Sequence, residues 1–219
     1  MRLPEARAKS FMKIYGIRIY PKSVEVIRGE GAPIFIHGRV ADNCSDFFYI
    51  FSPLASLWRG HVFANDFPVE YNEKGTRDDP IPQLREEFGA SLLDADPASQ
   101  LMLLRGDDFA SWGAALHFCE GAFLPIFPEP PKFELLKQLY WGRDFRLTSD
   151  TWPNRMRAVL HMWDDIYWQL FSTERTDIDC LIRAHANDPK LEMYFVDIDR
   201  EYPDPSNEEL QRAVIPDES

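Results

Sequence analysis

Cysteine is scarce in this sequence. The 219 residues include three cysteines, Cys44, Cys119 and Cys180, and no two of them form a CxxC pair. An odd number of widely spaced cysteines argues against a disulfide scaffold and fits a reducing compartment. We interpret the three as inert, partly buried thiols, because free cysteine is among the most often buried residue types.

Long hydrophobic runs are also missing. No apolar stretch approaches the roughly 20 residues that a membrane-spanning helix needs, and the charged start MRLPEARAKS lacks the apolar region of a signal peptide. We therefore expect a cytoplasmic protein with no membrane partner. Hydrophobic residues still make up 45% of the chain, so we expect a core and a single domain over residues 1–219. Residues 1–11 and 204–219 are candidates for disordered ends.

Catalytic motifs are absent as well. The sequence contains no GxSxG, GxGxxG or GxxxxGK[ST], and its five histidines form neither HxH nor HExxH. We therefore assign no catalytic, cofactor-binding or metal-binding residue, predict no cofactor, and expect that the protein is not an enzyme. The alternative is a small hydrolase or transferase, either magnesium-dependent or metal-independent, that uses dispersed carboxylates.

Positive charge is in short supply, and its shortage is local. Twenty-four Lys and Arg face 36 Asp and Glu, which gives a net charge of −12. Residues 164–219 hold 15 acids and 5 bases, a net of −10, so the other 163 residues carry only −2. Such a segment repels the phosphates of nucleic acid and attracts a basic protein. Solubility is the simpler explanation of the same charge.

The first third of the chain has the short, alternating segments of an antiparallel meander. Strands are predicted over residues 13–21, 23–29, 33–42 and 46–52, with a further strand within 56–66. The separating segments contain Gly, Pro, Asn and Asp, which are typical of turns.

The middle of the chain has helical spacing. We predict helices near residues 81–92, 97–105, 107–120 and 127–142, the last of them ending at Gly142. The first helix has an apolar face at Ile81, Leu84, Phe88 and Leu92.

The last third predicts a β-β-α-β unit. Strands at 157–163 and 167–172 form a hairpin, a helix follows over 172–189, and a strand occupies 190–199. Ser172 or Thr173 is the expected N-cap of that helix. Its inner face should consist of Ile178, Leu181, Ile182 and His185. The predicted fold is therefore α+β: an antiparallel sheet with helices from the middle of the chain packed on it, and a C-terminal β-β-α-β unit.

Asp197 and Asp199 are the most suggestive acidic pair. They point to the same side of a strand end, where two carboxylates can hold a metal ion or face a basic partner. Phosphatases with an Asp-x-Asp pair carry it on the first strand of a βαβ fold, whereas this pair lies near the end of the sequence. We therefore favour a surface that faces a partner.

Aromatic residues are dense between residues 140 and 171, and exposed Trp and Tyr often anchor interfaces. Most of these rings should be core, but some are expected to line a binding face. The candidate partner-binding residues are Trp163, Asp164, Asp165, Trp168, Asp197, Asp199 and Glu201.

The stretch WDDIYWQLFSTERTDIDCLIRAHANDPKLEMYFVDIDREYP, residues 163–203, resembles the C-terminal part of bacterial polymorphic-toxin immunity proteins. The shared features are a W/Y-DD turn, a strand, a helix and a final strand that ends in D-x-D-R. The resemblance implies an inhibitor that blocks a cognate toxin domain, which is often basic, and it carries over no catalytic residue. An adaptor or structural protein is the remaining alternative.

Overall fold

The structure, a computed structural model, describes residues 12–21, 49–67, 79–113, 121–142, 147–163, 167–188, 191–199 and 211–212. Its strands are β1 (Tyr15–Pro21), β2 (Val62–Asp66), β3 (Leu92–Asp96), β4 (Leu101–Arg105), β5 (Gly121–Phe127), β6 (Ala158–Trp163), β7 (Tyr167–Ser172), β8 (Leu191–Val196) and β9 (Gln211–Arg212). Its α-helices are α3 (Ile81–Phe88), α4 (Phe109–Trp112), α5 (Phe133–Trp141) and α6 (Arg175–His185), and its 3₁₀ turns are η1 (Ser52–Leu54), η2 (Gly89–Ser91) and η3 (Gly106–Asp108). No helix within these ranges combines the length and the apolar character needed to cross a bilayer.

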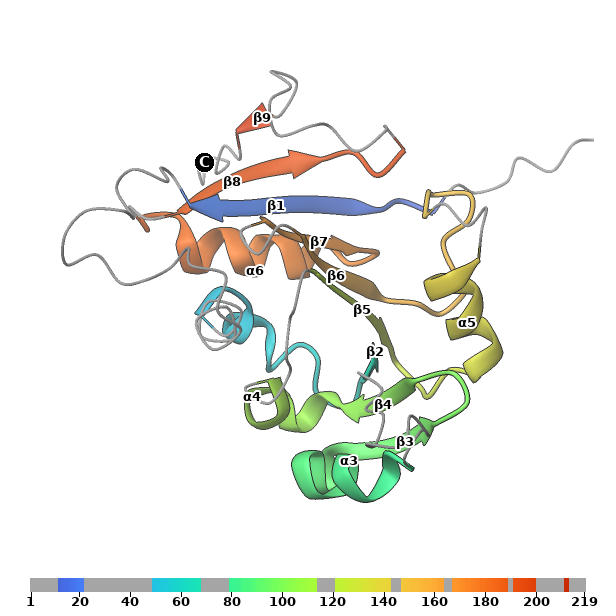
Figure 1. Cartoon of the computed structure of the whole chain (residues 1–219). Coiled ribbons are helices and arrows are strands. Elements are labelled where there is room, and N and C mark those ends of the chain that lie inside the picture. Colours follow the sequence, from blue (N-terminus) through green and yellow to red (C-terminus); the bar gives the residue numbers. More distant parts are fainter. Residues whose placement is uncertain are drawn as a thin grey trace, which may run out of the picture.

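The strands form one sheet in the order β3-β4-β2-β5-β6-β7-β1-β8-β9, which extends through the molecule (Figure 1). Each neighbouring pair is antiparallel. The fold is therefore α+β with an antiparallel sheet and packed helices, and the predicted C-terminal unit is confirmed as β6-β7-α6-β8.

The N-terminal strand β1 lies inside that C-terminal unit. It pairs with β7 on one side and with β8 on the other. Gly16 permits the close fit, because a Cβ atom there would lie 2.5 Å from the carbonyl oxygen of Val196 and 2.8 Å from the Phe171 ring. The two ends of the chain are thus joined in one sheet by hydrogen bonds.

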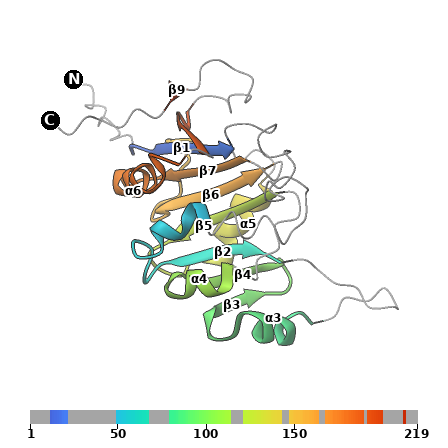
Figure 2. The same cartoon turned by 90° about the vertical axis from the view of Figure 1, so that its left-hand side faces the viewer.

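The sheet buries both of its faces. Alternating residues of each strand enter different cores; Leu170, for example, belongs to one core and Phe171 to the other. Helices α4 and α6 cover the first face and α5 covers the second, as Figure 2 shows with α6 in front of the sheet and α5 behind it. Burial on both faces explains why several strands are apolar at every position.

The predicted helix over residues 97–105 is wrong for this reason. Residues 97–100 form a turn, and Leu101–Arg105 is strand β4, between β3 and β2. The four apolar residues at its start are all buried, and they alternate between the two cores. A continuous apolar run of this length cannot be told from a buried helix by periodicity alone.

Other boundaries differ from the sequence-based prediction. Residues 49–51 are helical and 52–54 form η1, so the strand predicted over 46–52 is wrong where the structure describes it. Helix α3 ends before Gly89, whose φ of +53° favours glycine, and Leu92 begins β3. The strands predicted over 23–29 and 33–42 lie outside the described residues.

Two further middle elements agree in part with their predictions. The helix predicted over residues 107–120 is present as the single turn α4, and residues 114–120 lie outside the described residues. The helix predicted over 127–142 is α5, which ends before Gly142 as predicted.

Helix α5 is held on the sheet where β2 and β5 separate. β5 pairs with β2 at Ile126 and Phe127, and the pairing stops before Pro125, whose nitrogen carries no hydrogen. There the hydroxyl oxygen of Tyr140 lies 2.5 Å from the carbonyl oxygen of Phe123 and 3.2 Å from that of Ala64. The phenol has one proton, so it donates to one of these two carbonyl oxygens at a time. It thereby provides a hydrogen-bond donor where the β2–β5 ladder has ended.

Helix α6 confirms the predicted inner face, because Ile178, Leu181, Ile182 and His185 are all buried. The N-cap prediction is wrong: Glu174 occupies that position without a side-chain bond. The Ser172 hydroxyl instead accepts a hydrogen bond at 3.0 Å from the backbone N–H of Glu174, the N-cap residue itself. A side-chain cap would accept from the N–H of the second or third residue of the helix.

The substitution Leu181→Ala should reduce the free energy of unfolding by about 3 kcal/mol, because it removes a buried side chain and leaves a cavity. Arg183→Ala, on the exposed side of the same helix, should change it by no more than about 0.5 kcal/mol. Urea titration followed by circular dichroism measures both. Equal, small effects of the two substitutions would contradict this packing of α6.

Candidate functional site

Arg157 and Asp177 form a buried ion pair between the segment before β6 and the first turn of α6. The Nε–Oδ2 distance is 3.2 Å and the Nη2–Oδ1 distance is 2.7 Å. The Asp177 side chain is fully buried, and that of Arg157 is 18% exposed. Ser172, at the end of β7, donates its hydroxyl proton to Asp177 at 2.7 Å. The pair therefore joins β6, β7 and α6 at one point.

The remaining Arg157 contacts reach a fourth segment. Nη1 donates to the carbonyl oxygen of Leu57 at 3.1 Å and lies 3.0 Å from Nε2 of His61. A guanidinium has only donors, so Nε2 must be the acceptor, and the ring proton of His61 lies on Nδ1. Nδ1 then donates to the carbonyl oxygen of Arg59 at 3.0 Å. These two contacts hold the His61 ring in one orientation.

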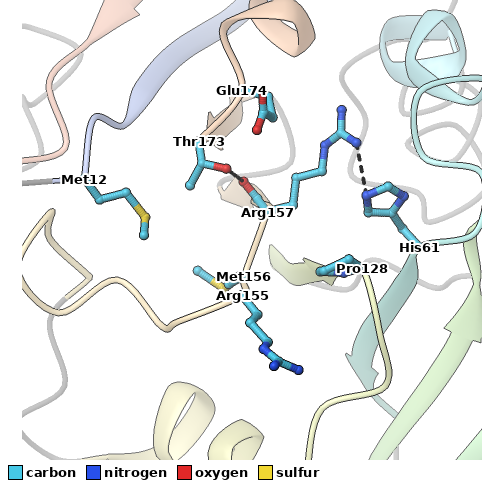
Figure 3. A pocket seen from close by; sticks show the side chains of 8 residues that line it. All are labelled: Met12, His61, Pro128, Arg155, Met156, Arg157, Thr173 and Glu174. Atoms are coloured by element: carbon cyan, nitrogen blue, oxygen red, sulfur yellow. Dashed lines mark hydrogen bonds between the residues drawn. The ribbon is translucent and has the colours of Figure 1, made fainter.

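A pocket of about 340 Å³ opens beside this network (Figure 3). In Figure 3 the Arg157 guanidinium turns toward His61, and the Arg155 side chain extends in the opposite direction. The Thr173 hydroxyl donates to the backbone carbonyl of Arg157 at 3.1 Å. The lining residues are Met12, His61, Pro128, Arg155, Met156, Arg157, Thr173 and Glu174.

The pocket offers a mixed surface of two thioethers, a proline and a few polar groups. Arg155 is paired with the exposed Glu129 at 3.0 Å, and the Arg157 guanidinium is paired with Asp177. Both cations at the pocket are therefore already neutralised within the protein. Of the predicted partner-binding residues that the structure describes, none lines this pocket.

Asp197 and Asp199 follow β8, and both are exposed. Asp199 accepts hydrogen bonds from the backbone N–H and from the hydroxyl of Ser149, each at 2.8 Å. Asp197 accepts from the backbone N–H of Asp199 at 3.1 Å. Within the described ranges, no three His, Cys, Asp or Glu side chains are grouped so that they could hold a metal ion. The pair therefore shapes the chain locally and presents negative charge at the surface.

The prediction that Trp168 lies at a partner-binding surface is wrong. The residue is 1% exposed and packs in the core on the α6 side of the sheet, because the alternation of β7 directs it there. Trp168 therefore cannot contact a partner in the folded protein. The side chain of Trp163, together with Asp164, Asp165 and Glu201, lies outside the described residues.

An exposed aromatic residue that we did not single out from the sequence is Trp141, at the end of α5, which is 50% exposed. Leu136 and Leu139 are the buried side of this helix. At about 100° per residue, Trp141 lies about 140° around the helix from Leu136. A helical wheel of residues 133–141 would have found it, since the apolar face points elsewhere.

A row of polar side chains crosses the face of the sheet that α5 covers. His161, Gln169 and Arg18 are direct cross-strand neighbours on β6, β7 and β1. The side-chain oxygen of Gln169 accepts from Nε of Arg18 at 2.7 Å. Burial, with a smaller contribution from the Arg18 charge, lowers the pKa of His161 to about 4. A neutral imidazole next to a buried arginine avoids repulsion between two cations.

No family model, curated protein or solved structure matches the chain. The resemblance of residues 163–203 to immunity proteins consequently stays a prediction, and the functional proposal rests on geometry and charge. The two features that bear on it are the exposed acids at the end of β8 and the exposed indole at the end of α5.

Proposed function

We propose that this protein is a cytoplasmic immunity-type inhibitor, which binds a cognate bacterial toxin domain and masks it by surface complementarity. The observation that carries the proposal is the charge distribution, a net of −10 within residues 164–219 out of −12 in total. Asp197 and Asp199 present part of this charge to solvent. A basic toxin domain would be attracted and oriented by such a surface.

The proposed contact set differs from the predicted one. Asp197 and Asp199 stay in it because they are exposed, and Trp168 leaves it because it is buried. Trp163, Asp164, Asp165 and Glu201 remain predictions.

A hydrolase or transferase would use the pocket beside Arg157. A hydroxyl nucleophile needs a neighbouring base that takes up its proton. The Thr173 hydroxyl instead donates to a backbone carbonyl, and Nε2 of His61 accepts from Arg157. Both groups are engaged within the protein, and this geometry favours a binding role over catalysis.

The test uses the product of the adjacent gene, in a form inactivated at its own active site, as the binding partner. We expect a one-to-one complex whose association rate falls as salt rises from 50 to 300 mM, values chosen because screening strengthens over this range. The double variant Asp197→Asn, Glu201→Gln should associate several-fold more slowly. Asp199 is left unchanged, because its bonds to Ser149 could make its loss a structural effect.

The matched control is Glu86→Gln, Glu87→Gln, which removes two exposed charges from α3. It should associate at nearly the wild-type rate. Co-expression with the active partner should restore growth, which separates an inhibitor from an adaptor that binds without protecting. An association rate indifferent to salt and to both double variants would refute steering by this surface.

A further inference from the structure

The pocket beside Arg157 has walls that backbone hydrogen bonds hold in place. The Arg157 N–H donates to the carbonyl oxygen of Ile126 at 2.8 Å, and the Arg157 carbonyl accepts from the Thr173 N–H at 2.9 Å. Nε1 of Trp152 donates to the carbonyl oxygen of Met156 at 2.7 Å. A pocket with fixed walls loses little conformational entropy when a ligand enters it.

One apolar side chain at this pocket stays in water. Met12 is 39% exposed, whereas Met156, which also lines the pocket, is buried. Figure 3 shows the Met12 side chain directed toward the pocket. A ligand that covers this thioether would remove apolar surface from water, and methionine sulfur makes favourable contacts with aromatic rings.

The pocket does not suit an anion. Arg157 directs its N–H groups to the two carboxylate oxygens of Asp177, to a backbone carbonyl oxygen and to a ring nitrogen of His61. Four of its five N–H groups therefore already have acceptors. The Glu174 carboxylate also lines the pocket and would repel an anion.

The pocket does not suit a cation either. Glu174 is the N-cap of α6, so the positive end of the helix dipole lies at the pocket. The Arg157 guanidinium is a second positive group in the lining. The face of an aromatic ring is attracted to a guanidinium, which would repel an ammonium group. An uncharged ring therefore fits these walls better than either kind of ion.

Two hydrogen-bond acceptors at the pocket have remaining capacity. The Thr173 hydroxyl donates its proton to a backbone carbonyl and keeps its lone pairs. The Glu174 side chain is exposed, and no described residue forms a hydrogen bond or an ion pair with its carboxylate. A ligand with one O–H or N–H group would thus find an acceptor at the start of α6.

We propose that this pocket binds one uncharged aromatic ring that carries an O–H or N–H group, as phenols and indoles do. The ring contacts the Met12 thioether and the Arg157 guanidinium, and its polar hydrogen is donated to Glu174. An apolar cavity of about 150 Å³ is enough for benzene, so about 340 Å³ admits a single or a fused ring. This chemistry belongs both to a free phenol or indole and to a Tyr or Trp side chain of a protein partner.

The experiment titrates the full chain with indole and follows the ¹³C-labelled methyl groups of its six methionines by NMR. The signals of Met12 and Met156 are identified with Met12→Leu and Met156→Leu. An aromatic ring shifts the resonances of methyl groups beside it, so these two signals should move and that of Met193, on β8, should not. The dissociation constant should be on the order of 1 mM, as expected for so small a ligand.

The hydrogen bond to Glu174 has its own test. N-methylindole has no N–H, and it should bind several-fold more weakly than indole. Glu174→Ala should weaken indole binding by a similar factor, while Glu174→Gln keeps an acceptor oxygen and should retain most of the affinity. The matched control Glu86→Ala, on α3, should bind indole like the wild type. Unchanged unfolding midpoints show that the Glu174 variants are folded, and Glu174→Gln keeps the test valid if the alanine variant unfolds.

Three further probes decide the class of ligand. Cyclohexanol has a donor but no aromatic ring, benzoate is an anion and cyclohexylammonium is a cation, and each should bind at least several-fold more weakly than indole. Equal or tighter binding of any of them would overturn the assignment of an uncharged ring. Indole that leaves the Met12 and Met156 signals unmoved would overturn the site itself.

A competition experiment identifies the source of the ring. If saturating indole weakens the complex with the inactivated product of the adjacent gene, the pocket receives a Tyr or Trp of that partner. If the complex is unaffected, the ligand is a free compound. The inference does not depend on the inhibitor proposal, because a partner that fails to bind would count against that proposal and leave the indole titration unchanged.

Discussion

Replacement of Asp177 by alanine should reduce the free energy of unfolding by about 3–5 kcal/mol, because it leaves a mostly buried guanidinium without its carboxylate. Nε and Nη2 of Arg157 both lose their acceptor, and so does the Ser172 hydroxyl. Urea unfolding followed by tryptophan fluorescence gives the value. The loss should be larger than for any single surface charge.

The matched control for this ion pair lies on the same helix. Arg175 and Asp179 are 2.7 Å apart at i and i+4, and both side chains are about two-fifths exposed, at 41% and 43%. Asp179→Ala should therefore cost only about 0.3–0.5 kcal/mol. The double variant Arg157→Met, Asp177→Leu should recover much of the Asp177→Ala loss, since neither charge then remains buried alone. If Asp177→Ala costs no more than Asp179→Ala, the buried pair is not a structural link.

The second large effect should come from the aromatic cluster of Trp58, Phe63, Phe109 and Trp112. The Phe63 ring centroid is 5.0 Å from that of Trp112 and 5.4 Å from that of Trp58, and all four residues are buried. Trp112→Ala should cost about 3–5 kcal/mol, because it empties a large volume between β2 and α4.

The two tryptophans differ in one polar atom, and this difference gives a sharper comparison. Nε1 of Trp112 donates to the carbonyl oxygen of Arg105 at 2.6 Å, whereas Nε1 of Trp58 is buried with no acceptor among the described residues. Trp112→Phe removes a ring and a hydrogen bond, and Trp58→Phe removes a ring and an unsatisfied donor. Trp112→Phe should therefore reduce the free energy of unfolding by about 1–2 kcal/mol more than Trp58→Phe does. The reverse order, measured by urea titration, would contradict this bonding pattern.

These stability tests also protect the functional experiments. Arg157, Asp177 and the aromatic cluster hold the first face of the sheet, whereas Asp197 and Asp199 are exposed after the end of β8. Variants of the proposed contact residues can therefore be checked for an intact fold by the same unfolding assay. A binding loss without a stability loss is then a property of the surface.

Local patterns account for the parts of the fold that the sequence predicts well. The apolar spacing of residues 178–185 identifies the inner face of α6, and the two flanking strands follow from their β-rich composition. Gly142 correctly marks the end of α5. Each of these signals lies within one element and one buried face, so neighbouring residues contain all the information.

The candidate functional residues were likewise predicted only in part from the sequence. The sequence identifies Asp197 and Asp199 as exposed acids, but it places Trp168 at the surface, where alternation along β7 and the cover of α6 bury it. It does not show that Asp199 bonds Ser149, 50 residues earlier in the chain. It also does not show that the end of α5 meets β2 and β5 through the hydroxyl of Tyr140.

The sequence by itself determined the α+β class, the C-terminal β-β-α-β unit and the concentration of negative charge in the last quarter. The tertiary structure alone decided that β1 enters this unit between β7 and β8, that Leu101–Arg105 is a strand, and that Arg157 meets Asp177. Strand order, burial on both faces of a sheet and ion pairing are set by contacts between residues distant in sequence. Periodicity and composition report only on the nearest neighbours along the chain.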